Sequence, residues 1–569
     1  MRKQVILLTA TLICVFLLCG TISAADPVNE TTVETPKIVI LNVISQSSYY
    51  HQTFKEEGKK LNESLNVSVY AGTTTTDPTI TDEEKIPANI NLRNYDVVFA
   101  CGWNSGAPGL KSKLDDAKQY TNVIVINPVN LSPGNVDLNE YPEITKYWSY
   151  GTEKNLRNLL LYLGNKFCGL NATVEPPETI PTIGIYHPDA PIIFKNTKDY
   201  LEWYKNSDAN HTYDPTKTTV GIITSMSHIT SNNTKATDHI IKTLEEKGCN
   251  VIPVYGSSQW DVDEFFTKEG KPLVDVIISI MYNVQNEAEN FKFLDVPILY
   301  GVGLYYESPE EWENGKEGVS PHQVPYIGLS EIYGLIEPIV VYARIIDDTT
   351  TGTYHYEPID SQIDYITDRA IAWAKLRHMN NSEKKVVITY YNDGGGKANM
   401  GTEMEYYLDV PASIINLLKE MQKQGYNLGG SISDLETLTE LMVNFGRNVG
   451  PWAPGELDKL VKTGNPILVP EKTYLSWFKE LPLQRQEEVI KYWGEPPGDL
   501  MVWEDSNGKR YIVIPVIRLG NVIITPYPIR PGFAWELYEE NGTFSTDQGE
   551  IPPHHQYIAF YLAMNKIFG

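Results

Sequence analysis

The residues best suited to metal or proton chemistry lie in the stretch "SPHQVPYIGLSEIYGLIEP", where His322 precedes Glu331 by nine positions. An imidazole and a carboxylate that lie close together can bind a divalent metal or transfer protons. Two ligands do not define a metal site, and such a pair is often structural. Glu331 has apolar neighbours such as Leu329 and Ile332, among which an ionised carboxylate without a partner would be costly. This pattern favours a functional Glu331 in an apolar environment.

Four further histidines are candidates for ligand or metal binding. His187, with Asp189 nearby, and His228 each follow a predicted strand, and ligands commonly bind at strand ends. The alternative for both is a hydrogen-bonded structural histidine. His554 and His555 follow two prolines and would point apart on any regular element, so at most one of them, taken here as His554, could bind a given metal. The alternative for this pair is an exposed loop.

The glycine-rich stretch "NDGGGKANMG" follows a predicted strand and invites comparison with a phosphate-binding loop. Successive glycines let backbone N–H groups turn toward an anion. A Walker motif needs Ser or Thr after its lysine, but Ala398 follows Lys397, and Tyr391 occupies the place of the first glycine. The sequence therefore predicts no ATP site in this chain. A backbone cradle for another anion and a plain strand-to-helix turn both remain open.

Short apolar strands alternate with helical patterns along the chain, an order typical of parallel sheets covered by helices. The alternation starts at "KIVILNVIS", restarts at "TIGIYHPDAP" and "TTVGIITSMSHI", and starts again at "KKVVITYYNDGGG". We therefore predict the α/β class, with several flavodoxin/Rossmann-like parallel-sheet modules in one multi-domain chain. Residues 218–304 are expected to form one parallel sheet. The predicted domains are residues 37–170, 171–383 and 384–569.

The first 25 residues have the order of a secretory signal peptide. Arg2 and Lys3 precede the apolar run Val5–Leu18, and the small residues of "TISAAD" suit cleavage near Ala24 or Ala25. We expect an exported, extracellular or cell-surface protein, with a retained membrane anchor as the alternative. Dense N-x-S/T sequons agree with export and predict a glycoprotein. They begin at Asn29, Asn62, Asn66, Asn130, Asn171, Asn210, Asn232, Asn380 and Asn541.

Charge and cysteine content exclude two classes of protein. The formal net charge of −25 argues against nucleic-acid binding, which requires a positive surface. Outside the predicted signal peptide the cysteines are Cys101, Cys168 and Cys249. An odd number of widely spaced cysteines forms neither a disulfide framework nor a paired C-x-x-C metal site, so buried apolar thiols are expected.

Several stretches occur in the order found in one known family. They include "VGIITSMSHI", "VDVIISIMYN", "LDVPILYGVG", "SPHQVPYIGLSEIYGLIEPIVVYAR", "YYNDGGGKANMG", "GRNVGPWAPGEL", "IPVIRLGNVIITPYPIR" and "PPHHQYIAFYLAM". Together they resemble the large subunit of the CobN/magnesium chelatase H type, which binds a tetrapyrrole and inserts cobalt or magnesium. The resemblance is strongest from residue 180 onward and weaker over residues 37–180.

The sequence departs from the family pattern at three motifs. The family's Pro-Pro-Gly-Lys element is Gly-Gly-Gly-Lys here, with Lys397 and Asn399 retained. The stretch "LSEIYG" resembles the family's Pro-Glu-Leu-Asp-Gly element, but Tyr333 replaces its aspartate while Glu331 and Gly334 are kept. The family's H-G-x-x-E-W-x-P-G-K motif is absent together with its C-terminal half. We therefore expect the chain to stop at an internal edge of a longer architecture.

The resemblance implies a corrin or porphyrin bound in a cleft between modules, lined by residues 322–334 and 390–401. The residues expected to bind the macrocycle are Tyr333, Tyr390, Tyr391, Lys397 and Asn399. Those expected to handle the metal and the pyrrole protons are Glu331 and His322 as catalytic residues, with His554 as a further metal ligand. The metal itself would be cobalt or magnesium.

The resemblance also implies partners. They are separate ATPase chelatase subunits and a second chain that carries the missing C-terminal half. The chain alone is then expected neither to hydrolyse ATP nor to insert cobalt into a corrin. The alternative is an exported protein that binds a tetrapyrrole or a metal without chelatase activity.

Overall fold

The computed structural model divides into two compact units, residues 1–368 and 369–569, which join within helix α12 (Asp360–His378). Among the residues that the model describes, no helix is both long enough and apolar enough to cross a bilayer. The described residues are 35–42, 48–73, 80–103, 109–129, 131–206, 213–256, 262–281, 292–315, 318–321, 323–348, 353–392, 408–430, 434–450, 453–529 and 552–568.

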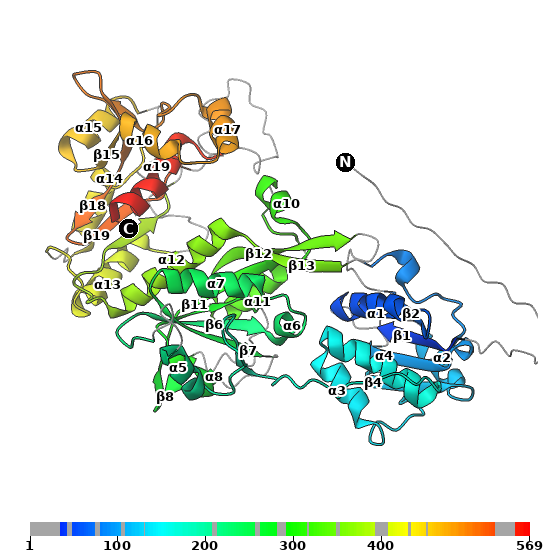
Figure 1. Cartoon of the computed structure of the whole chain (residues 1–569). Coiled ribbons are helices and arrows are strands. Elements are labelled where there is room, and N and C mark those ends of the chain that lie inside the picture. The colour runs from blue at the N-terminus through cyan, green and yellow to red at the C-terminus, as the bar shows by residue number, and fades with distance from the viewer. Residues whose placement is uncertain are drawn as a thin grey trace, which may run out of the picture. The chain divides into compact units, whose positions relative to one another are not determined.

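The first sheet of unit 1 has four parallel strands in the order β2-β1-β3-β4 (Figure 1). Successive side chains of a strand point to opposite faces. Ile38 and Phe99 therefore pack with helices α1, α3 and α4, whereas Val39 and Val98 pack with α2. The elements are β1 (Lys37–Asn42), α1 (Ser48–Lys60), β2 (Asn66–Ala71), β3 (Val97–Trp103), α2 (Leu110–Ala117), β4 (Asn122–Val129), α3 (Pro142–Tyr150) and α4 (Glu153–Phe167).

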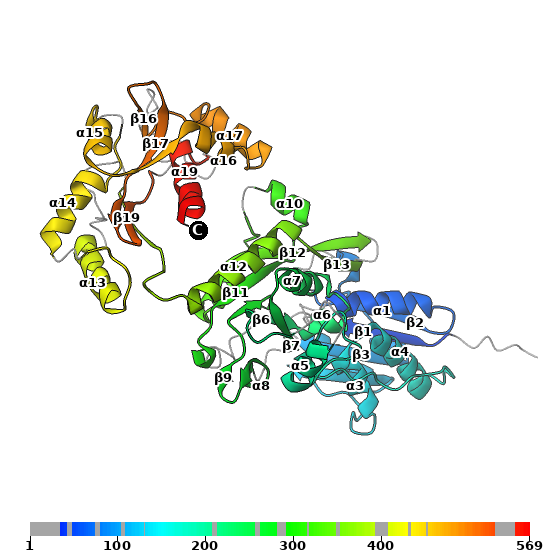
Figure 2. The same cartoon turned by 60° about the vertical axis from the view of Figure 1, so that its left-hand side comes forward.

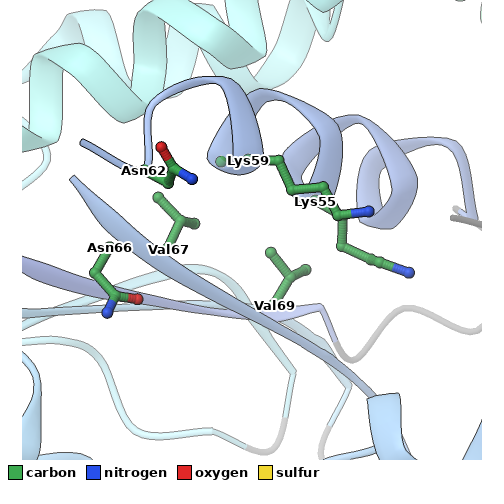
Figure 3. A pocket seen from close by; sticks show the side chains of 7 residues that line it. Lys55, Lys59, Asn62, Asn66, Val67 and Val69 are labelled. Atoms are coloured by element: carbon green, nitrogen blue, oxygen red, sulfur yellow. The ribbon is translucent and has the colours of Figure 1, made fainter. Parts of the chain in front are cut away.

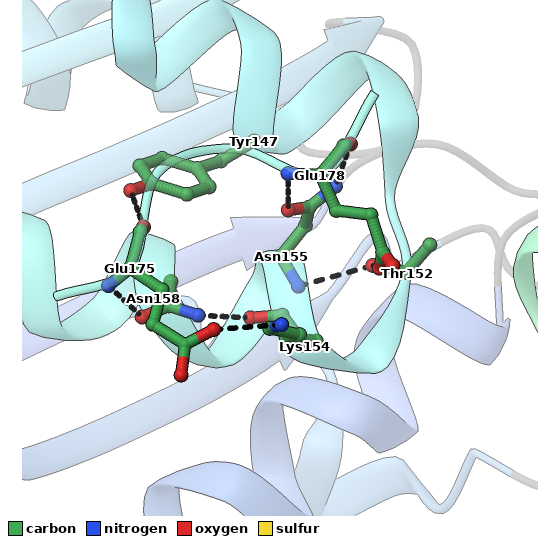
Figure 4. Close-up of polar contacts among 7 residues, drawn as sticks. All are labelled: Tyr147, Thr152, Lys154, Asn155, Asn158, Glu175 and Glu178. Carbon is green, nitrogen blue, oxygen red and sulfur yellow. Dashed lines mark hydrogen bonds and ion pairs between the residues drawn. The ribbon is translucent and has the colours of Figure 1, made fainter. Parts of the chain in front are cut away.

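The extended segment after α4 is held on this helix by side-chain amides (Figure 4). Asn155 donates to the Glu178 carbonyl and accepts from the Glu178 N–H, both at 2.9 Å. Asn158 accepts from the Glu175 N–H at 2.9 Å, and the Tyr147 hydroxyl donates to the Glu175 carbonyl. Both asparagines are buried, where an unpaired amide would be costly. These contacts explain why a buried face of α4 carries polar residues.

The second sheet of unit 1 has seven strands in the order β13-β12-β11-β10-β6-β7-β5. The five central strands are parallel, which confirms the parallel sheet predicted for residues 218–304. The two edge strands are antiparallel, which the sequence did not predict. The strands are β5 (Gly184–Ile185), β6 (Thr219–Ser225), β7 (Asn250–Gly256), β10 (Val276–Ser279), β11 (Ile298–Leu304), β12 (Ile336–Asp348) and β13 (Thr353–Pro358).

The described residues of unit 2 form two three-stranded sheets rather than one large parallel sheet. The strand β14 (Val386–Tyr390) pairs in parallel with β19 (Val522–Pro526), and β19 pairs antiparallel with β18 (Ile517–Leu519). The other sheet is antiparallel, in the order β15-β17-β16. Its strands are β15 (Ile467–Pro470), β16 (Val502–Glu504) and β17 (Arg510–Ile514). The predicted module is α/β, but among its described strand pairs only β14 with β19 is parallel.

The two faces of β19 are covered by different helices (Figure 2). Val522 and Ile524 pack with α13 and α14, whereas Ile523 belongs to the cluster that contains α16 and α19. Strand β19 therefore lies at the centre of unit 2. The helices of this unit are α13 (Val410–Lys423), α14 (Leu435–Phe445), α15 (Glu456–Thr463), α16 (Glu471–Phe478), α17 (Leu483–Trp493) and α19 (His555–Ala563).

We predict that Gly303→Ala destabilises unit 1 by roughly 1–3 kcal/mol, the usual effect of overpacking a core. A Cβ at Gly303 of β11 would lie 2.1 Å from Cζ of the fully buried Tyr342. Gly328, inside α11 (Val324–Ile332), is the control because a Cβ there meets nothing within 4 Å. Gly328→Ala should stabilise the helix by roughly 0.5–1 kcal/mol. Urea unfolding measures the free energy of unfolding of both variants. Equal changes in the two variants would contradict the close packing of Gly303 against Tyr342.

Candidate functional site

The carboxyl ends of the parallel strands β14 and β19 lie side by side in unit 2, the position at which α/β sheets commonly bind ligands. The Tyr527 N–H donates to the Tyr390 carbonyl at 2.7 Å, just beyond the strand pair. Asn392 is the second residue after β14, and the glycine-rich stretch follows Asn392 in sequence. This end of the sheet is therefore the candidate site of unit 2.

Asn448 joins the two strand ends from the loop after α14. Its N–H donates to Asn392 Oδ1 at 2.8 Å. Its Nδ2 donates to the carbonyls of Tyr527 at 2.7 Å and of Asn392 at 3.3 Å. Both asparagines are buried. The loop is thereby fastened to both strands through one side chain.

Asn448 Oδ1 is buried and has no hydrogen-bond partner among the residues that the structure describes. Leaving such an acceptor unsatisfied costs about 1–3 kcal/mol. Buried polar atoms are almost always paired, so an exception in a folded protein needs an explanation. Asn448 Oδ1 therefore remains an acceptor for an N–H or O–H group that none of the described residues supplies.

His554 connects helix α19 to the end of β19. It is the N-cap of α19, and its Nδ1 accepts from the Tyr557 N–H at 3.1 Å. Its Nε2 lies 2.7 Å from the Ile529 carbonyl, so the proton is on Nε2. Burial lowers the pKa of His554 to about 4, and the ring is neutral at pH 7.

The adjacent His555 is buried as well and points elsewhere. Its ring nitrogens lie 2.9 Å from the Tyr474 hydroxyl and 2.8 Å from the Gly494 carbonyl. Burial lowers its pKa. The expectation of an exposed histidine pair is therefore wrong, because both rings are structural hydrogen-bonding groups. In this geometry neither nitrogen of His554 is open to a metal.

Three tyrosines form a partly exposed aromatic group beside the same strand ends. The Tyr561 hydroxyl donates to the Tyr527 hydroxyl at 2.5 Å, and the hydroxyls of Tyr527 and Tyr557 lie 3.3 Å apart. The rings of Tyr557 and Tyr561 are 5.2 Å apart between centroids. Tyr561 is 43% exposed. Burial and the hydroxyl contacts raise the pKa of Tyr561, so the group is neutral at pH 7.

Glu331 lies near the end of α11, and its side chain is exposed. The apolar environment predicted for it is wrong, because its neighbours Leu329 and Ile332 are themselves 47% and 75% exposed. An ionised Glu331 is therefore hydrated and needs no partner. Tyr333, the C-cap residue of α11, is half-buried. His322 lies outside the described residues, so its pairing with Glu331 stays a prediction.

Tyr390 belongs to the core of unit 2 and is 5% exposed. Its hydroxyl donates to the Gly446 carbonyl, and burial raises its pKa well above the usual value. The predicted contact of Tyr390 with a macrocycle is therefore corrected: its ring and its hydroxyl are occupied by the protein. Tyr391 is half-buried, and its contact with a macrocycle stays a prediction. Lys397 and Asn399 lie outside the described residues.

Among the described residues, no group of three or more histidine, cysteine or acidic side chains lies close enough together to hold a metal ion. Glu331 belongs to unit 1 and His554 to unit 2. The described geometry therefore gives no support to these residues as a metal centre. The described part of the site at the strand ends contains amides, phenols and a neutral imidazole, which suit ligand binding rather than metal binding.

The two histidines after strands of unit 1 make structural contacts. His187 Nε2 lies 3.1 Å from Glu245 Oε1, which also accepts from the Tyr204 hydroxyl at 2.9 Å. His228 Nδ1 lies 3.2 Å from the Thr224 hydroxyl, and complete burial lowers its pKa to about 4. Both observations favour the alternative of hydrogen-bonded structural histidines.

Sequence reasoning did not single out Asn448 or the tyrosine group. The signals were present in two of the stretches that carry the resemblance. Asn448 and Arg447 form a polar pair between glycines in "GRNVGP", and Tyr557 and Tyr561 have the i, i+4 spacing of one helix face. Asn448 and the two tyrosines belong to one site because they contact Tyr527, which is remote from them in sequence, and local pattern does not predict such contacts.

The chain is similar in sequence to known chelatase subunits. A family model described as CobN/Magnesium Chelatase matches residues 145–569. An uncharacterized protein of Methanocaldococcus jannaschii is 30% identical over 75% of this chain and 35% of its own length. The magnesium-chelatase subunit ChlH of Oryza sativa subsp. indica is 29% identical over 74% of this chain and 30% of its own length. The chain thus spans about a third of these relatives.

A solved structure shares the fold. The catalytic subunit of cobaltochelatase from Mycobacterium tuberculosis matches 93% of this chain and 41% of that chain, with a TM-score of 0.55 and 20% sequence identity. Because the match covers 93% of this chain, it includes residues of both units.

We predict that His554 makes the stability of unit 2 dependent on pH. The pKa is about 4 in the folded chain and about 6.5 when unfolded, so the unfolded chain binds the extra proton between these values. The contribution of the neutral His554 ring to the free energy of unfolding is therefore fully present above pH 6.5. It decreases as the pH falls toward 4, and the loss at pH 5 is about 2 kcal/mol.

The variant His554→Asn tests this dependence, because asparagine is also a good N-cap acceptor but does not titrate. Its unfolding free energy, measured in urea, should fall less between pH 7 and pH 5 than that of the wild type. An equal loss in wild type and His554→Asn would contradict the buried neutral ring.

Proposed function

Because the chain belongs to the CobN/magnesium chelatase family, we propose that it binds a tetrapyrrole at the strand ends of unit 2. The observation that supports the proposal is the buried Asn448 at the carboxyl ends of β14 and β19, whose Oδ1 has no partner among the described residues. The family match includes all of this unit. This position also agrees with the general rule that ligands of α/β proteins bind at the carboxyl ends of parallel strands.

The chemistry of the site suits a large flat ligand. The rings of Tyr527, Tyr557 and Tyr561 offer aromatic surface with hydroxyls that bond to one another. Stacked or edge-on aromatic contacts contribute about 0.5–1.5 kcal/mol each beyond burial of area. The neutral ring of His554 places no charge beneath an apolar face. Asn448 Oδ1 adds one acceptor for a donor on the ligand.

The role proposed for this chain is binding of the macrocycle. Metal insertion would then depend on partner subunits that hydrolyse ATP, because the glycine-rich stretch lacks the Walker pattern. Cobalt or magnesium would be the cargo of the complete assembly. The purified chain is accordingly expected to bind a corrinoid or a porphyrin without converting it.

We predict that Tyr561→Ala weakens tetrapyrrole binding roughly threefold to tenfold, the effect of losing one aromatic contact. Tyr561→Phe keeps the ring and should bind nearly as well as the wild type. Titration of the full chain with cobalamin and with protoporphyrin, followed by absorbance, measures each affinity. Tyr492 of α17 is an equally exposed tyrosine of unit 2, and Tyr492→Ala is the control that should bind normally.

The proposal is wrong if the folded wild-type chain binds no corrinoid or porphyrin below about 100 μM, which corresponds to roughly 5.5 kcal/mol. Circular dichroism establishes that each variant is folded before its titration. A loss of binding in Tyr492→Ala equal to that in Tyr561→Ala would also place the ligand elsewhere.

We further predict that Lys397→Ala weakens binding of a carboxylate-bearing porphyrin by about 1.5–3 kcal/mol, the range for a buried charge-assisted contact. The reason is the lysine that this chain shares with the family motif at the glycine-rich stretch. Binding of a porphyrin whose carboxylates are esterified should be unaffected by the substitution. Equal losses for the acid and the ester would show that Lys397 does not contact a carboxylate.

A further inference from the structure

The described sequons lie only on exposed asparagines. Five of the nine N-x-S/T sites fall on described residues, and each of these asparagines is exposed: Asn62, Asn66, Asn171, Asn232 and Asn380. None of the buried asparagines begins a sequon: Asn155, Asn158, Asn233, Asn250, Asn392 and Asn448. A carbohydrate chain attached to a buried side chain would prevent folding. Glycosylation therefore requires sequons on exposed asparagines, as observed here.

Two of these asparagines lie at a cavity of about 300 Å³ between α1 and β2 (Figure 3). Val67 and Val69 form its apolar side, and Lys55 and Lys59 project over it from α1. Small-molecule sites have this combination of apolar walls and a few polar groups, and this volume is at the lower end of their range. Gly58 allows the close approach of helix and strand, because a Cβ there would lie 2.9 Å from Val67 Cβ.

The cavity borders an edge of the first sheet. Strand β2 is the last strand in the order β2-β1-β3-β4, and beyond its ladder with β1 the described pairing is one bridge between Ala71, at its end, and Lys85. An exposed edge strand presents unpaired N–H and C=O groups to other chains, and proteins usually cover or charge such edges. A bulky hydrophilic group at this position would protect β2.

We propose that Asn62 carries an N-linked oligosaccharide whose first sugar lies in this cavity. Asn62 follows α1 and lies on the same side of β2 as Val67 and Val69, whereas Asn66 points to the other side of the strand (Figure 3). The apolar face of the sugar ring packs on the two valines. Its hydroxyls face the ammonium group of Lys59.

The attachment requires an oligosaccharyltransferase and a sugar donor linked to a lipid phosphate. Asn62 Nδ2 forms a bond to the anomeric carbon, and the bond from this carbon to the phosphate oxygen breaks. The lipid phosphate leaves with the electron pair, and the amide loses one proton. Ser64 supplies the hydroxyl that the sequon needs two positions after the asparagine. The reaction takes place after export, as the N-terminal segment predicts.

Mass spectrometry of peptides from the full chain, isolated from the cells that make it, tests the proposal. The peptide that contains Asn62 should carry a sugar mass in the wild type. Ser64→Ala removes the sequon without touching Asn62 and should abolish this mass, whereas Ser64→Thr should retain it. An unmodified Asn62 peptide in the wild type would overturn the proposal.

Hydrogen exchange tests the position of the sugar. Enzymatic removal of the glycan should increase deuterium uptake of residues 66–71, which form β2, and leave the uptake of β4 unchanged. Unchanged uptake of β2 would overturn the placement in the cavity. Both experiments are independent of tetrapyrrole binding, so either proposal can fail without the other.

Discussion

The arrangement of unit 2 depends on the hydrogen bonds that Asn448 makes across the ends of β14 and β19. Its amide holds the carbonyls of Tyr527 and Asn392, and its N–H holds Asn392 Oδ1. Residue 527 is thereby fixed at the point where its ring meets Tyr557 and Tyr561 of α19. His554 fixes the start of that helix to the Ile529 carbonyl. The aromatic group and the strand ends are therefore positioned by uncharged hydrogen bonds.

The site could be predicted only in part because its residues meet through contacts between distant segments. The family resemblance identified the stretches that contain Asn448 and the tyrosines, but local pattern could not assign their contacts. The environment of Glu331 was predicted wrongly. Its apolar neighbours suggested burial, yet α11 leaves its apolar side chains exposed, and sequence pattern alone does not say which face of a short helix is covered.

The fold was more predictable where pairing follows chain order. The central strands of the seven-stranded sheet are continuous apolar runs joined by helices, and this pattern indicates parallel strands. The edge strand β13 and the sheet β15-β17-β16 pair antiparallel, which depends on partners chosen in three dimensions. Hydrophobic periodicity identifies strands but does not choose their neighbours.

The pairing of β14 with β19 also sets the order of folding. Val386 pairs with Val522, so β14 has no described ladder partner until residue 522 has been synthesised. At a synthesis rate of about 5–20 residues per second, that interval lasts roughly 7 to 27 seconds. The sheets of unit 1 pair over residues 37–358 and can form on the ribosome earlier. During this interval β14 is an apolar strand without its partner, and a chaperone that shields such strands would act on this segment of the nascent chain.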